Sequence, residues 1–219
     1  FISLGASKDL IGFSNSRLAY DEIISKFCYT VEAATLKRKI TSTDISEQYR
    51  RGVPFSDECI ETASETIQKF LGCVKDWSDF KFSFNKATLF SWLVFVRQNL
   101  YIEDQHLQQI VVHFEFCRAF IKGKYKKADD IYSETYKQLQ KQLPFFEIML
   151  NTFNQRSSMG STDALSIIYR DIIIDIFRDT LLGNATPLLK CALDSFQEVE
   201  NMNYVLETIV DKYNWGEHF

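Results

Sequence analysis

The chain has 219 residues, of which 46% are hydrophobic and 15% aromatic, and its formal net charge is −4. This composition excludes wholesale disorder, and a pI near 5.5 lacks the overall basic signature of a dedicated nucleic-acid-binding protein. Only 8 glycines and 3 prolines are present, too few for the closely spaced turns of a β-sandwich or barrel. The composition therefore predicts an all-α protein.

The first half of the chain is predicted to hold an irregular arm followed by four helices. Residues 1–16 are rich in Gly, Ser and Asn, which is typical of an arm or linker. Apolar residues then recur at helical spacing over about 18–39, 44–52 and 56–74. The stretch 85–101 is apolar almost all round, so we expect this helix at the centre of the core, with Asn85 as its N-cap.

The second half is predicted to continue in the same style. We expect a polar loop at 155–161, and a helix start at Thr186-Pro187 with a last helix running to about 201 or 212. The other helices are expected over about 107–121, 128–143, 146–153 and 165–183. We therefore predict one all-α domain of about eight helices, with 17–183 as the main helical domain and 184–219 as an additional C-terminal helix or helices.

Residue types that carry catalysis or bind metals are scattered along the sequence. Five cysteines occur without a CxxC pair and each falls in an apolar stretch, which favours buried thiols in a reducing cytoplasm over disulfides or metal ligands. The sequence contains no phosphate-binding glycine loop, no HExxH motif, no long uncharged apolar run and no signal peptide. We therefore expect no metal, no cofactor, no catalytic residue, no membrane partner and a cytoplasmic location.

One basic cluster stands out from this background. It consists of Arg118, Lys122, Lys124, Lys126 and Lys127, and it surrounds Tyr125. Cations at a turn between helices can contact nucleic-acid phosphates, and an adjacent tyrosine can stack on a base. A solvated turn at the C-terminal end of a helix has the same composition, so this alternative stays open.

Three segments, in order, resemble one bacterial family. Residues 12–27 are similar to its R-M-x-x-D-E-x-x-L-R-F stretch, and 84–90 to its I-N-K-A-L-F signature. Residues 160–163, followed by Tyr169-Arg170, are similar to its T-S-D … V-x-x-R ending. The family is the ParB-like domain-of-unknown-function 262 family, which includes the GmrSD-type restriction proteins, and the resemblance covers residues 12–171.

The resemblance implies a C-terminal helical region rather than the catalytic part of such a protein. Family members carry an N-terminal ParB/sulfiredoxin-like domain with an Asp-Gly-Gln-Gln-Arg motif, associated with nucleotide hydrolysis and DNA cleavage. That motif does not occur in this sequence. Because the chain begins at Phe1 without a methionine, we expect it to be a piece of a longer protein.

The expected function is a non-catalytic helical region that supports a nuclease domain of the same protein and helps to position DNA. A free-standing helical adaptor that binds another protein is the alternative, and homo-oligomerisation stays open. The polar residues of the motifs are expected at the junction with the N-terminal domain: Arg17, Asp21, Glu22, Asn85, Lys86, Asp163 and Arg170. For Asn85 and Lys86, a helix cap followed by an exposed lysine is the plainer alternative.

Overall fold

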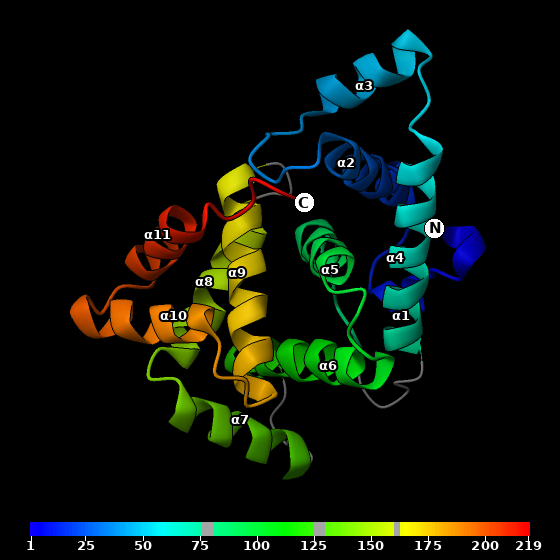
Figure 1. The fold of residues 1–219 in the computed structure, drawn as a ribbon. Helices are drawn as coiled ribbons and strands as arrows, with labels where there is room; N and C mark the ends of the chain where they lie inside the picture. The colour runs from blue at the N-terminus through cyan, green and yellow to red at the C-terminus, as the bar shows by residue number, and fades with distance from the viewer. Residues whose placement is uncertain (76–80, 125–129, 160–162) are drawn as a thin grey trace.

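The computed structural model describes residues 1–75, 81–124, 130–159 and 163–219, and within these ranges it contains eleven α-helices and no strands (Figure 1). The predicted all-α class is confirmed. None of these described helices is long and apolar enough to cross a membrane. The helices are α1 (Lys8–Ile11), α2 (Ala19–Ala33), α3 (Ser42–Arg51), α4 (Asp57–Lys75), α5 (Lys86–Gln98), α6 (Asp104–Ile121), α7 (Asp130–Gln142), α8 (Phe146–Ser158), α9 (Ala164–Leu181), α10 (Pro187–Glu198) and α11 (Met202–Tyr213).

Local capping explains where the helices differ from the prediction. Residues 1–16, expected to be irregular, contain the short α1, whose N-cap Ser7 accepts a hydrogen bond from the backbone inside the helix. The last predicted helix is broken at Val199, which has extended backbone angles, and Asn201 caps a new helix, α11. The loop predicted at 155–161 is wrong for its first four residues, because α8 continues to Ser158. Residues 160–162 lie outside the described residues.

Two helices, α5 and α9, share the core. Ten of the thirteen residues of α5 and fourteen of the eighteen residues of α9 are buried, so burial does not single out the one central helix expected at 85–101. The ring of Phe114 in α6 lies 4.9 Å from those of Phe153 and Phe177 and 5.5 Å from that of Trp92, in edge-to-face geometry. This aromatic cluster therefore joins α5, α6, α8 and α9.

Helix α9 carries a buried acidic face. Asp171 accepts a hydrogen bond from Trp215 Nε1 at 2.8 Å, and Arg178 is paired with Asp175 and, at 2.9 Å, with Asp179. Burial raises the pKa of Asp171 to about 6, although hydrogen bonds from Trp215 and Gln98 oppose the shift. Burial, together with the neighbouring Asp171, also raises the pKa of Asp175. The hydrogen bond from Trp215 ties the C-terminal segment to α9 in the core.

Both ends of the chain pack against distant segments. Gly12 has φ +92°, and a Cβ atom there would lie 2.8 Å from the carbonyl oxygen of Phe82, so glycine is required for this close approach. Near the other end, the backbone N–H of Leu36 donates to the carbonyl oxygen of Gly216 at 2.8 Å. Helices α10 and α11 pack on each other and on α9, and α11 also contacts α8.

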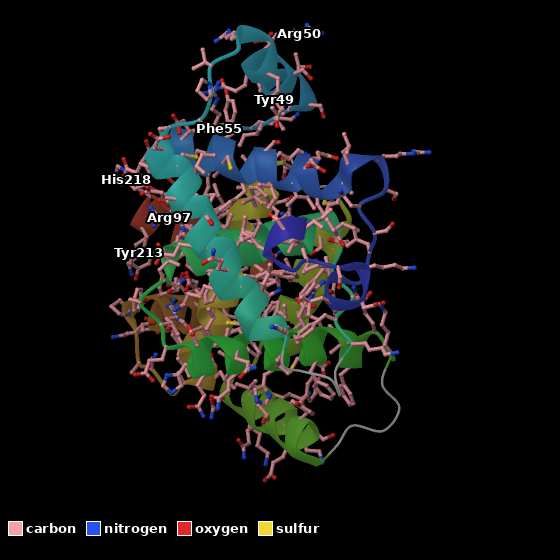
Figure 2. All side chains as sticks on the ribbon, turned by 90° about the vertical axis from the view of Figure 1, so that its right-hand side faces the viewer. Tyr49, Arg50, Phe55, Arg97, Tyr213 and His218 are labelled. Carbon is pink, nitrogen blue, oxygen red and sulfur yellow. The ribbon has the colours of Figure 1, made fainter. Side chains whose placement is uncertain are left out.

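Helix α3 lies outside the core, on the outer side of α2 (Figure 1). None of its residues is buried, and the hydroxyl groups of Tyr49 and Ser25 lie 2.7 Å apart across the contact with α2. Figure 2 shows Tyr49 and Arg50 on this helix, with Phe55 where the chain turns back towards α4. The helix therefore depends on its caps, including a capping box formed by Thr41 and Asp44, more than on packing.

Candidate functional site

The first two motif segments meet at the N-terminal end of α5. Lys86 Nζ, from α5, lies 2.5 Å from Glu22 Oε2, and Lys26 Nζ lies 2.5 Å from Glu22 Oε1, both glutamate oxygens coming from α2. Burial opposes the ionisation of Glu22, but the hydrogen bonds from Lys26 and Lys86 outweigh it and lower its pKa. Glu22 and Lys86 therefore form an ion pair between α2 and α5.

Side chains from the second and third motif segments, Asn85 and Arg170, contact the C-terminal end of α8. Asn85 caps α5, as predicted, by accepting a hydrogen bond from the backbone of Thr88 at 2.8 Å, and its Nδ2 donates to the carbonyl oxygen of Ser157 at 3.3 Å. Arg170 is wholly buried in α9, and its Nη1 donates to the carbonyl oxygen of Arg156 at 2.9 Å. Two of the motif side chains thus satisfy consecutive carbonyl groups where α8 ends.

The other motif residues act locally. Asp163 is the N-cap of α9, where its carboxylate accepts a hydrogen bond from the backbone of Ser166 at 2.8 Å. Hydrogen bonding to the side chain of Ser166, and then to its backbone, lowers the pKa of Asp163 against the opposing effect of partial burial. Asp21 accepts a hydrogen bond from Asn15 Nδ2 at 3.1 Å. Arg17 has φ 55° and an exposed side chain that takes part in no ion pair among the described residues. No hydrogen bond or ion pair among the described residues joins these three residues into one site.

The expectation that Arg118 is part of an exposed basic turn is wrong. Its side chain is only 7% exposed, and its Nη1 lies 2.7 Å from both carboxylate oxygens of Glu115. Arg118 Nε donates to Asn154 Oδ1 at 2.9 Å, and the guanidinium lies 4.4 Å from the centre of the Phe153 ring. Trp92 Nε1 donates to the same glutamate at 2.8 Å. Arg118 is therefore part of the contact between α5, α6 and α8, one turn before α6 ends.

A cavity of about 390 Å³ opens at the C-terminal end of α6, beside the segment that leads into α5. It is lined by Lys81, Ser83, Glu115, Arg118, Ala119, Lys122 and Lys124. Lys122 and Lys124 belong to the predicted basic cluster, whereas Lys126 and Lys127 lie outside the described residues. Lys81 and Ser83 were not predicted, because only the folded chain brings them beside the end of α6.

The cavity carries an excess of positive charge. Lys81, Lys122 and Lys124 are exposed, and among the described residues none of them takes part in an ion pair. Partial burial lowers the pKa of Lys122, and the nearby charges of Arg118 and Lys124 lower it further. Among the described lining residues the one carboxylate, that of Glu115, is already paired with Arg118, so this part of the cavity is suited to an anion with several oxygen atoms.

Among the described residues we find neither a cluster of metal ligands nor an activated thiol. In the described ranges, no group of three or more His, Cys, Asp or Glu side chains is placed to hold a metal ion. All five cysteines are buried and unpaired, and burial raises the pKa of Cys59 and of Cys73 to about 12. Such thiols stay protonated at neutral pH and are poor nucleophiles.

Comparison with known proteins adds no relative. The chain matches no protein-family model, no curated protein and no solved structure. The similarity of its three segments to the ParB-like family therefore stays a prediction, and the geometry of the described residues carries the functional argument.

Proposed function

We propose that the chain is a non-catalytic helical region of a bacterial GmrSD-type restriction and defence protein. It supports a nucleotide-dependent nuclease domain that lies outside this sequence, and it contacts the phosphate backbone of DNA through the cavity at the end of α6. The single observation that carries the DNA contact is a set of three exposed lysines in this cavity that form no ion pair with any described residue: Lys81, Lys122 and Lys124.

The charge arrangement favours phosphate over a neutral ligand. Bringing three lysines to one cavity, where Glu115 is already paired with Arg118, is unfavourable without a further counter-charge. Burial lowers the pKa of Lys122, and repulsion by Arg118 and Lys124 lowers it further. Phosphate groups relieve the repulsion and release counterions from DNA. Lysines provide point charges and no base-specific geometry, so the contact positions the DNA without reading its sequence.

The supporting role rests on how the motif residues are used. Glu22 and Lys86 join α2 to α5, Asn85 joins α5 to α8, and Arg170 joins α9 to α8. Each of these polar side chains holds one helix against another. The resemblance supplies the identity of the supported domain, a nucleotide-dependent nuclease.

A matched pair of variants tests the DNA contact. Fluorescence anisotropy would measure the affinity of the 219-residue chain for labelled duplex DNA. Replacing Lys81, Lys122 and Lys124 by glutamine should weaken binding by at least about tenfold. The control replaces the exposed lysines Lys137, Lys141 and Lys190 on α7 and α10, which changes the net charge equally. Equal affinities of the two variants would refute the role of the cavity.

Helix α3 supports the alternative function, a free-standing adaptor that binds another protein. This helix buries no residue, while Tyr49 is 66% exposed and Val53, just beyond the helix, is 58% exposed.

The coding sequence of the intact gene separates the two functions: an upstream Asp-Gly-Gln-Gln-Arg motif supports the nuclease partner and removes the free-standing adaptor. Nuclease or nucleotide-hydrolysing activity of the purified 219 residues would contradict the non-catalytic role.

A further inference from the structure

A second cavity lies beside the one at the end of α6, and Lys81 lines both of them. This second cavity, hereafter the apolar cavity, has a volume of about 440 Å³. Sites for small organic molecules have volumes of roughly 300–1,000 Å³, so the apolar cavity is large enough for one. Its described lining includes the apolar side chains of Leu4, Leu10, Leu71, Val74 and Phe82.

Helix α1 fixes the segment between the two cavities. The backbone N–H of Phe84 donates to the carbonyl oxygen of Ile11 at 3.2 Å, and Gly12 packs directly against the backbone of Phe82. The ring of Phe82 is buried and lies almost parallel to that of Phe84, with the ring centres 5.2 Å apart. Because Lys81 directly precedes this packed segment and lines both cavities, the segment forms their common wall.

The rim of the apolar cavity is polar and carries two lysines. Lys75 and Lys81 are exposed, and neither forms an ion pair with any described residue. Ser7 and Asp9, which are also exposed, place hydrogen-bond acceptors at the same rim. The positive charge continues past Lys81 into the cavity at the end of α6. The two cavities together therefore suit a ligand with an apolar body, a hydrogen-bonding edge and an attached anionic group.

A nucleotide with an unpaired base has this combination of groups. Its base has an apolar face and polar edges, and bases of single strands bind proteins by stacking on apolar and aromatic side chains while lysines track the phosphates. An acyl chain would fill the apolar cavity as well, but it has no hydrogen-bond donor for Ser7 or Asp9. A base that is paired within a duplex must leave the stack to enter a cavity, and this costs least where the base is unpaired.

We propose that the apolar cavity takes one unpaired base of a DNA strand, while the lysines of the cavity at the end of α6 hold the phosphates next to it. This inference rests on the proposed DNA contact. It adds the class of DNA that the chain prefers, which is DNA with an unpaired nucleotide.

Two DNA probes that differ by a single base test this inference. Both are labelled duplexes with a one-nucleotide bulge, and the bulged nucleotide carries adenine in one probe and no base in the other, so the number of phosphates is the same. Fluorescence anisotropy would measure the affinity of the wild-type chain for each probe. The adenine bulge should bind at least about tenfold more tightly than the abasic bulge, because only the former has a base to stack. Equal affinities for the two probes would overturn the inference.

A matched pair of variants tests whether the base lies in the apolar cavity. Leu10→Trp fills this cavity, and Leu193→Trp makes the same change at another half-buried leucine, on α10. Leu10→Trp should bind both probes equally, whereas Leu193→Trp should keep the preference for the adenine bulge. Leu4→Gln makes the cavity wall polar without adding volume, so it should reduce the preference even if Leu10→Trp does not fold, as circular dichroism would show. A full preference in Leu4→Gln, or in folded Leu10→Trp, would overturn the inference.

The phosphate contact is tested separately, on fully paired DNA. If the glutamine variant of Lys81, Lys122 and Lys124 binds paired DNA more weakly and the two bulge probes bind equally, the phosphate contact stands and the base site is refuted. If that variant binds paired DNA as the wild-type chain does, the proposed function fails, and the inference that rests on it fails as well.

Discussion

Glu115→Gln is expected to destabilise the chain by about 3–5 kcal/mol, because it would leave the guanidinium of Arg118 buried without its carboxylate. Both side chains are 7% exposed, and two 2.7 Å contacts join them, so solvent cannot take over the lost interaction. Glutamine keeps an oxygen that can accept from Trp92 Nε1, so the loss reports mainly on the charge pair. Arg118→Met should cost a similar amount by leaving Glu115 unpaired. The double variant should be much closer to the wild-type chain, because no buried charge is left alone.

Urea unfolding of these four proteins would complete a double-mutant cycle and give the coupling free energy. The matched control is Glu47→Gln, which breaks a 3.6 Å pair with Arg51 between side chains that are 53% and 71% exposed. Breaking that pair should change the free energy of unfolding by less than about 1 kcal/mol. An equally small effect of Glu115→Gln would refute the reasoning, since it would mean that Arg118 is solvated and free to contact phosphate.

Three further predictions follow from local features. Because burial raises the pKa of Asp171 to about 6 from 3.8, the folded state binds this proton more tightly, so the free energy of unfolding should fall by up to about 3 kcal/mol between pH 4 and pH 7. In urea titrations Asp171→Asn should remove this part of the fall and leave the part that comes from Asp175, whose pKa is also raised; an unchanged pH profile would contradict the prediction. Gly12→Ala should lower the melting temperature more than Gly5→Ala. Both residues have positive φ, but only at Gly12 would a Cβ atom meet backbone atoms, at 2.8 Å. Equal shifts in melting temperature for the two variants would contradict this prediction. Asn85→Ala should lower the free energy of unfolding, measured in urea, by about 1 kcal/mol, because α5 loses its cap. Asn85→Asp should keep most of the cap's contribution to stability. Wild-type stability of Asn85→Ala would argue against the cap.

The helical class and several caps could be predicted because they depend on neighbouring residues. The scarcity of Gly and Pro indicated long helices, and Asn85 and Thr186 each precede a helix whose backbone their side chains cap. The end of α8 was harder. The polar sequence from Gln155 to Ser158 is typical of a loop, but Ser157 is buried and its hydroxyl donates to the carbonyl oxygen of Phe153, so the helix continues.

The candidate site depended on contacts between distant segments. The ion pair of Glu22 with Lys86, and the approach of Lys81 to the end of α6, need the packed fold and leave no local pattern in the sequence. Arg118 was misassigned for the same reason. Its sequence neighbours are lysines, but the side chain turns inward to Glu115, one helical turn away. The i, i+3 spacing of Glu115 and Arg118 inside an apolar stretch was the available signal.

The salt dependence of DNA binding tests the central claim most directly. The affinity for duplex DNA would be measured over a range of salt concentrations for the wild-type chain and for the variant with glutamine at Lys81, Lys122 and Lys124. If each of these lysines neutralises one phosphate, the slope of log affinity against log salt should become shallower by about 2.7 in the variant. The same slope in both proteins would contradict the claim that this cavity contacts phosphate.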